Sequence, residues 1–203
     1  MNTPFGWLNM FKTLSTDAVF GWIQEWVREE SRNLLVGALA TASNNIPYSR
    51  LVAIKEINAQ GVVFFTQLGS QKVQQIADNP MVSITIFLPE HARQIIIAGK
   101  AMALSEQENQ QYWKAYPKES QLRFIVYGPR SGEKIKDNSD LDELLNNYRQ
   151  QYQNKSVEKP EAYIGYRIAI QELKLYQLNA QSISDSFILT PDDLNWKLSQ
   201  LVP

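Results

Sequence analysis

Two cationic side chains stand in one short apolar segment, Ser49-Arg50-Leu51-Val52-Ala53-Ile54-Lys55. Burying a cation costs free energy unless it meets an anion. Arg50 and Lys55 therefore either reach water at a strand end or edge, or bind anionic groups. Side chains alternate between the two faces of a strand, so a spacing of five places Arg50 and Lys55 on opposite faces. If they bind anions, they serve two different anionic groups.

A second candidate anion site lies in the segment FFTQLGSQK, residues 64–72. A predicted strand passes there through a glycine-containing turn into a helix start that carries Ser70 and Lys72. The free backbone N–H groups and the positive dipole end of a helix favour an anion, and Lys72 adds a full charge. The alternative is an ordinary capped surface helix with a solvated lysine.

Gln94 is a third polar residue in an apolar context, at the head of the strand-like run IIIAGKA. Its amide both donates and accepts hydrogen bonds, so it needs partners when it enters such a strand. The edge of a flavin ring offers that mixture of donors and acceptors. A neighbouring backbone offers it as well.

Composition excludes several classes of site. The chain has 203 residues, 44% of them hydrophobic, and a formal net charge of −1, whereas binding to nucleic acid or a membrane surface needs a basic surplus. It has no cysteine, and its one histidine, His91, cannot build a multi-histidine metal site. We therefore predict no metal, no nucleic-acid partner and no membrane association. The N-terminus has neither a bilayer-length apolar run nor a signal-peptide pattern, so we expect a cytoplasmic protein.

The elements that would position these residues are mostly short strands. Between Leu34 and Leu104, apolar runs rich in Val, Ile and Phe alternate with turn signals, and no long helix separates them. This pattern favours an antiparallel meander or barrel over a doubly wound sheet. Strand patterning returns near the C-terminus in four separate runs, YIGYRIAI, LKLYQLNA, DSFIL and NWKLSQLV.

Helices are predicted before and between these strands. Apolar residues at helical spacing predict an N-terminal helix at about 16–30. A helical insertion is predicted at about 105–153, opening with a capping box from Ser105 to Glu108. The strands begin before the insertion and resume after it, so we interpret residues 1–203 as a single domain.

The order of three pieces resembles a known family. SRLVAIK, FFTQLGSQKVQQIADNP and RQIIIAGKA are similar to the FMN-binding core of the pyridoxamine 5′-phosphate oxidase family, with similar gaps between them. The resemblance extends over roughly residues 17–203, through QYWKAYPKESQL, EAYIGYRIA, ELKLYQ and NWKLSQLVP. It implies a mainly β protein with α, an antiparallel split β-barrel with flanking helices. It also implies a homodimer that binds FMN between its subunits.

The resemblance assigns the FMN phosphate to Arg50 and Lys72, with Ser70 at the helix start. Gln71 stands where the family usually has an arginine on this phosphate. A neutral amide can still donate a hydrogen bond, but one charge-assisted contact is lost.

The rest of the cofactor has implied positions as well. The residues that would line the ribityl chain and the ring are Leu51, Val52, Phe65 and Thr66. Gln94 would hydrogen-bond the isoalloxazine. Tyr176 falls where the family has a ring-packing tryptophan, so an aromatic face is kept.

The implied substrate site departs further from the family pattern. Lys55, Tyr112 and Ser120 align with family residues that hold the phosphate of the vitamin B6 substrate, but Tyr116 replaces an arginine of that site. The family's Arg-Leu-His-Asp-Arg signature reads Ser-Ile-Ser-Asp-Ser at residues 182–186. Serines cannot supply the charge that pairs with a phosphorylated pyridine or assists its deprotonation.

Three functions follow from this pattern. The first is an FMN-dependent oxidoreductase that acts on a small molecule other than, or in addition to, pyridoxamine or pyridoxine phosphate. The second is a genuine pyridoxamine or pyridoxine 5′-phosphate oxidase with a divergent pocket. The third is a flavin-binding or empty barrel without turnover. We favour the first.

Overall fold

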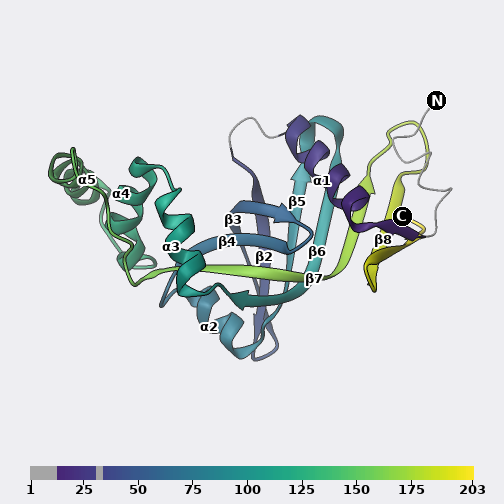
Figure 1. The fold of residues 1–203 in the computed structure, drawn as a ribbon, viewed down its shortest axis with the longest axis horizontal. Coiled ribbons are helices and arrows are strands. Elements are labelled where there is room, and N and C mark those ends of the chain that lie inside the picture. Colours follow the sequence, from purple (N-terminus) through teal and green to yellow (C-terminus); the bar gives the residue numbers. More distant parts are fainter. Residues whose placement is uncertain (1–12, 31–33) are drawn as a thin grey trace.

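The computed structural model describes residues 13–30 and 34–203 and contains a closed antiparallel barrel of six strands (Figure 1). The barrel runs in the order β7, β4, β3, β2, β5, β6, and β6 pairs with β7 to close it. This confirms the predicted antiparallel barrel with flanking helices. The barrel strands are β2 (Val36–Ser43), β3 (Ile46–Asn58), β4 (Gly61–Gln67), β5 (Met81–Leu88), β6 (Arg93–Ala103) and β7 (Tyr163–Gln177).

The longest strand, β7, corrects the sequence interpretation. YIGYRIAI and LKLYQLNA were predicted as separate strands, but one strand runs from Tyr163 to Gln177. Its first half pairs with β4 and its second half with β8 (Asp185–Asp192), while β6 pairs along most of its length. The register of β6 shifts next to Gly99, where a Cβ atom would lie 2.0 Å from the carbonyl oxygen of Ala169. This bulge bends the pair so that a single strand can serve two neighbours.

Beyond the barrel, the second half of β7 continues the sheet into three more strands. Beyond β8 lie β9 (Asn195–Gln200) and β1 (Thr13–Ser15), which pair in the order β8, β9, β1. Helix α1 (Thr16–Glu30) follows β1 directly and buries an apolar face. Its Phe20 ring meets the edge of Trp196 of β9 at 5.8 Å between centroids, which ties the helix to this extension.

Alternate residues of the barrel strands point inward and form one core. The largest fully buried members are Phe64, Phe187, Ile23, Leu39, Ile84, Ile86, Leu88, Ile95, Ile97 and Ile168. Figure 1 shows α1 and the short helix α2 (Gln71–Asp78) on opposite sides of the barrel strands. The interior of the barrel is therefore a packed core, and ligand chemistry is left to its ends and outer face.

The predicted insertion forms three helices, α3 (Glu106–Lys114), α4 (Lys118–Tyr127) and α5 (Ser139–Gln151), which lie together on one side of the barrel in Figure 1. The capping box of Ser105 and Glu108 is confirmed. A second apolar cluster joins these helices to the start of β7, with Trp113 edge-on to Tyr163 at 4.7 Å. No helix in the described ranges is long and apolar enough to cross a membrane.

Candidate functional site

Arg50 lies on the inward face of β3, near the barrel end that α2 covers. Its Nη1 donates to the Thr41 hydroxyl at 2.6 Å and to the Leu39 carbonyl at 3.3 Å, and its Nη2 donates to Oε1 of Gln75 at 2.7 Å. Thr41 and Gln75 are buried, and the Thr41 hydroxyl also donates to Gln75 at 2.6 Å. These neutral acceptors hold the guanidinium in place without cancelling its charge.

Lys72 reaches the same end of the barrel from the first turn of α2. Its Nζ donates to the Thr66 hydroxyl at 3.0 Å, and that hydroxyl lies 3.3 Å from Oγ of Ser70. Ser70 is the N-cap residue of α2, yet its side chain makes no capping hydrogen bond. We call Arg50, Thr66, Ser70 and Lys72 the basic pocket.

The basic pocket holds two positive charges, those of Arg50 and Lys72. Among the residues that the structure describes, neither Arg50 nor Lys72 forms an ion pair. Desolvation lowers the pKa of Lys72, and the nearby Arg50 charge lowers it further. Desolvation also lowers the pKa of Arg50. A phosphate bound here would relieve both effects, and the two cations and two hydroxyls form a donor set that fits it.

Three further residues lie near this pocket, one that was predicted and two that were not. Gln71, expected near a phosphate, is exposed at the first position of α2. Thr41 and Gln75 hold Arg50 but were not among the predicted residues. Gln75 could have been noticed, because it lies three residues after Lys72 and next to the buried Ile76 on one helix face.

The predicted alternation along β3 is confirmed. Val52 is buried on the inward face with Arg50, whereas Leu51 is 73% exposed on the outer face. Lys55 is exposed as well and lies away from the basic pocket. Arg50 and Lys55 therefore face different surroundings, as their spacing indicated.

Lys55 and Ser120 share a cleft of about 430 Å³ between the barrel and α4. We call it the cleft; its other lining residues are Leu34, Leu35, Ala53, Ile54, Phe65, Tyr116 and Pro117. The Phe65 ring stacks on Tyr163, with 4.7 Å between the ring centroids and 9° between the ring planes. A Cβ atom on Gly165, the cross-strand partner of Phe65, would lie 2.4 Å from that ring, so glycine is required there for the ring to take this position.

Tyr112, the third predicted substrate residue, lies outside the cleft lining. Its ring packs against the Phe65 ring, with 5.1 Å between the centroids, but its hydroxyl donates to Oε2 of Glu56. Desolvation raises the pKa of Tyr112, followed by the hydrogen bond to Glu56. The phenol is thus a neutral donor already engaged by a carboxylate of the protein.

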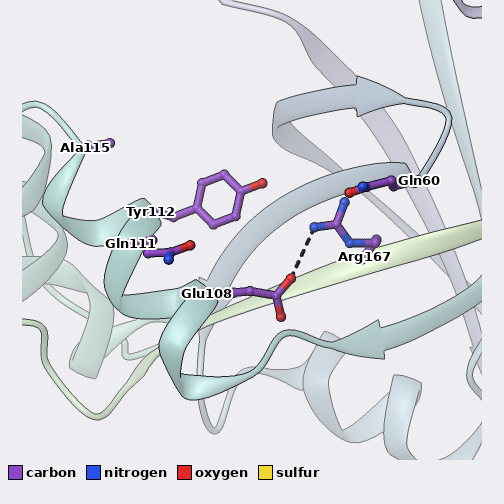
Figure 2. Close-up of a pocket in the computed structure, with 6 residues that line it drawn as sticks. All are labelled: Gln60, Glu108, Gln111, Tyr112, Ala115 and Arg167. Atoms are coloured by element: carbon purple, nitrogen blue, oxygen red, sulfur yellow. Dashed lines mark hydrogen bonds and ion pairs between the residues drawn. The ribbon is translucent and has the colours of Figure 1, made fainter.

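Tyr112 instead lines a second pocket of about 410 Å³, drawn in Figure 2. There Glu108 and Tyr112 project from α3 toward Arg167 of β7, whose Nη2 lies 3.3 Å from Oε1 of Glu108. We call Glu56, Glu108, Tyr112 and Arg167 the Tyr112 cluster. It clamps α3 onto the outer face of the barrel.

Gln94 and Tyr176 lie opposite each other on β6 and β7. Phe87 of β5 pairs with Gln94 on one side, and Ser186 of β8 pairs with Tyr176 on the other. Paired residues share a face, so these four form one row across the outer surface. In the described part of the chain, no hydrogen bond joins this row to the basic pocket or the cleft. The structure thus brings Gln94 and Tyr176, two of the residues predicted to contact the ring, together on the outer surface.

The segment Ser182–Ser186 forms a polar turn that leads into β8. Ser182 and Ile183 are exposed, and the Ser184 hydroxyl accepts from the backbone N–H of Asn179 at 3.2 Å. Asp185 and Ser186 are the first residues of β8. No cationic side chain stands within these five positions.

Comparison with known proteins gives the same relationship over most of the chain. The sequence model of the family described as pyridoxamine 5′-phosphate oxidase matches residues 23–136. A pyridoxine/pyridoxamine 5′-phosphate oxidase from Serratia proteamaculans is 33% identical over 162 residues, 79% of this chain and 73% of that protein. One from Salmonella newport is 32% identical over 159 residues, 77% of this chain and 71% of that protein.

Two solved structures share the fold at lower identity. PhzG from Burkholderia lata, solved with tetrahydrophenazine-1-carboxylic acid, has a TM-score of 0.76 and 22% identity over 93% of each chain. A pyridoxamine 5′-phosphate oxidase-related FMN-binding protein from Nostoc punctiforme has a TM-score of 0.72 and 16% identity over 90% of this chain and 96% of its own. The family match, the identity and the shared barrel agree, and the chain belongs to the pyridoxamine 5′-phosphate oxidase family.

Proposed function

We propose that this protein is an FMN-dependent oxidoreductase that acts on a small molecule. Membership of the family supports a flavin-binding, oxidoreductase-like protein. The observation that carries FMN in particular is the basic pocket, where Arg50 and Lys72 converge and form no ion pair with a described residue. A flavin that ends in a phosphate would supply the missing negative charge.

In this proposal each part of the cofactor has residues of its own. Arg50 and Lys72 bind the phosphate, with the Thr66 and Ser70 hydroxyls as further partners. Leu51 and Val52 directly follow Arg50 on β3, and Phe65 of β4 lines the cleft; we assign these three residues to the ribityl chain and ring. When bound, FMN supplies hydride chemistry, and the protein contributes position and electrostatics.

We also propose a homodimer. Among the described residues no hydrogen bond joins the row of Gln94 and Tyr176 to the basic pocket, and in a dimer the second copy would bring its own row there. Exposed apolar side chains on the outer face support such an interface. Leu51 and Thr85 flank Ala38 on neighbouring strands, and Phe87, 62% exposed, lies two residues beyond Thr85. Apolar surface of this kind is typical of protein–protein contacts.

Flavin titration tests the proposal most directly. The purified protein should quench FMN fluorescence with a saturable curve, and riboflavin, which lacks the phosphate, should bind at least about tenfold more weakly. Sedimentation at several concentrations should give a dimer. A protein without a flavin spectrum and without affinity for FMN would contradict every enzyme interpretation.

A specific observation favours a second candidate, genuine pyridoxamine or pyridoxine 5′-phosphate oxidase activity. Lys55 and Ser120, which align with substrate-phosphate residues of the family, share the cleft. Such an enzyme should release hydrogen peroxide when pyridoxamine 5′-phosphate is added in air. No release at millimolar substrate, with FMN bound, would exclude this candidate. FMN binding without turnover of any substrate would favour a non-catalytic flavin-binding protein.

A further inference from the structure

Among the residues that the structure describes, the lining of the cleft includes one charged side chain. Lys55 supplies that charge, the Ser120 and Tyr116 hydroxyls supply polarity, and the remaining lining residues are apolar or aromatic. Phe65 offers the cleft an aromatic surface, held by stacking on Tyr163. A lining of this kind suits a flat, mostly apolar molecule with a single polar end.

Tyr112 lies outside the cleft lining but packs against its Phe65 ring, and Glu56 engages the Tyr112 hydroxyl. The Tyr112 hydroxyl has one proton to donate, and it donates that proton to Glu56. It therefore cannot donate to a bound ligand unless the bond to Glu56 breaks. The other carboxylate oxygen of Glu56 accepts from the Asn58 side chain, so Glu56 is held from two sides.

The Tyr112 cluster, which touches the cleft through the Phe65 ring, also opposes a highly charged ligand. The Tyr112 cluster contains two carboxylates, Glu56 and Glu108, and one guanidinium, Arg167, so its net charge is negative. Lys55 is left to balance any anion in the cleft. A phosphate ester carries close to two negative charges at neutral pH, whereas a carboxylate carries one and matches Lys55.

We propose that Glu56 is a specificity-determining residue and that the cleft takes an aromatic or heteroaromatic monocarboxylate in preference to a phosphate ester. The carboxylate binds Lys55 and Ser120, and the ring packs against Phe65. This inference rests on the proposed function, in which the cleft is the substrate site of a flavin-dependent oxidoreductase.

Three ligands with one ring system and different charge test the preference. Pyridoxine is uncharged at its substituents, 4-pyridoxate carries one carboxylate, and pyridoxine 5′-phosphate carries the phosphate. Each is titrated by calorimetry into FMN-saturated protein and into the protein as purified. We expect 4-pyridoxate to bind roughly tenfold more tightly than pyridoxine 5′-phosphate. Equal or tighter binding of the phosphate, or no binding of any of the three, would overturn the inference.

Two variants and a control test whether Glu56 and Lys55 cause the preference for a carboxylate. Glu56→Gln should tighten pyridoxine 5′-phosphate about tenfold and 4-pyridoxate less, because a neutral amide no longer repels the second charge. Lys55→Met should weaken both anions and leave pyridoxine almost unchanged. Glu143→Gln removes a carboxylate from the exposed face of α5 and should change none of the three affinities. If Glu56→Gln does not change the ratio of the two anion affinities, Glu56 has no role in selection.

The two proposals fail in different ways. FMN affinity is measured by fluorescence on the same samples. Loss of FMN binding with the ligand order intact would remove the proposed function and leave the cleft's charge preference standing. Intact FMN binding with the reverse ligand order would remove only this inference.

Discussion

The basic pocket and the Tyr112 cluster both join barrel strands to a helix through charged side chains, but they balance positive charge differently. Arg50 and Lys72 meet neutral acceptors, Thr41, Thr66 and Gln75. Arg167 of the Tyr112 cluster meets Glu108 at 3.3 Å, and Glu56 is adjacent through Tyr112. Arg167 has carboxylates of the protein beside it and needs no anion from outside, whereas Arg50 and Lys72, half-buried and without an ion pair among the described residues, favour one.

In one fold, the charges of the Tyr112 cluster therefore hold a helix in place, whereas those of the basic pocket are available to bind a ligand. Both sites include residues of β3, only a few positions apart. The register of β3 against β4 shifts between Ile54 and Glu56, so Ile54 and Ile57 are both buried and Glu56 reaches α3 on the outer face. The bulge thereby separates the two sites, since regular alternation from Arg50 would have placed Glu56 on the Arg50 face.

The largest effect is expected from Arg50→Ala. The variant loses a charged donor to the FMN phosphate, so FMN affinity should fall about a hundredfold. Lys55→Ala, on the opposite face of the same strand, should change FMN affinity by no more than about twofold. Fluorescence titration of both variants, with circular dichroism to check folding, measures the contrast. Equal losses would contradict the assignment of the two cations to different ligands.

Arg167→Met tests the other side of the comparison. It leaves the half-buried Glu108 with its capping bonds to Ser105 but without its cationic partner, so the free energy of unfolding should fall by about 1 kcal/mol while FMN affinity stays unchanged. Urea denaturation gives the first quantity and flavin titration the second. The control is Arg123→Met, whose ion pair with Glu119 is exposed and should be worth less than about 0.5 kcal/mol. A large loss of FMN affinity in Arg167→Met would mean that the Tyr112 cluster supports flavin binding.

Lys72→Met should lower FMN affinity without lowering stability, the reverse of Arg167→Met. The variant removes one cation from the phosphate site, so FMN affinity should fall about tenfold. In FMN-free protein the free energy of unfolding should stay the same or rise slightly, because a desolvated charge next to Arg50 is removed. A clear loss of stability without FMN would show that the hydrogen bond from Lys72 to Thr66 stabilises the fold, and it would weaken the contrast with Arg167.

The sequence predicted much of this arrangement through local patterns. Alternation placed Arg50 and Lys55 on opposite faces, and the turn with Gly69 and Ser70 marked the start of α2. The insertion between Ser105 and the connector after α5 was predicted from helical spacing and a capping box. These features depend on neighbours along the chain, which a sequence displays directly.

Contacts between distant segments could not be read in this way. Gln75 holds Arg50 across 25 positions, and Glu56 holds Tyr112 across 56. The second contact depends on a bulge whose position follows from strand pairing. The continuity of β7 was missed because Gln171 and Glu172 look like a break, although antiparallel partners on both sides keep the strand extended through them.

The smallest expected effect is a pH dependence that belongs to Lys72. Burial, then the charge of Arg50, lowers the pKa of Lys72 below its ordinary value of 10.5. Between the lowered pKa and 10.5 the unfolded chain holds a proton that the folded chain has released, so stability from this group rises with pH across that window.

The matching measurement compares the free energy of unfolding of wild type and Lys72→Met in urea from about pH 8 to about pH 10.5. Other lysines and tyrosines titrate in both proteins and cancel in the difference. We expect wild type to gain on the variant as the pH rises, and to gain less when FMN is present, because its phosphate stabilises the charged lysine. A difference that is constant with pH would mean that Lys72 is solvated in the folded protein. The basic pocket would then hold one desolvated cation, Arg50, and its contrast with the Tyr112 cluster would depend on that residue.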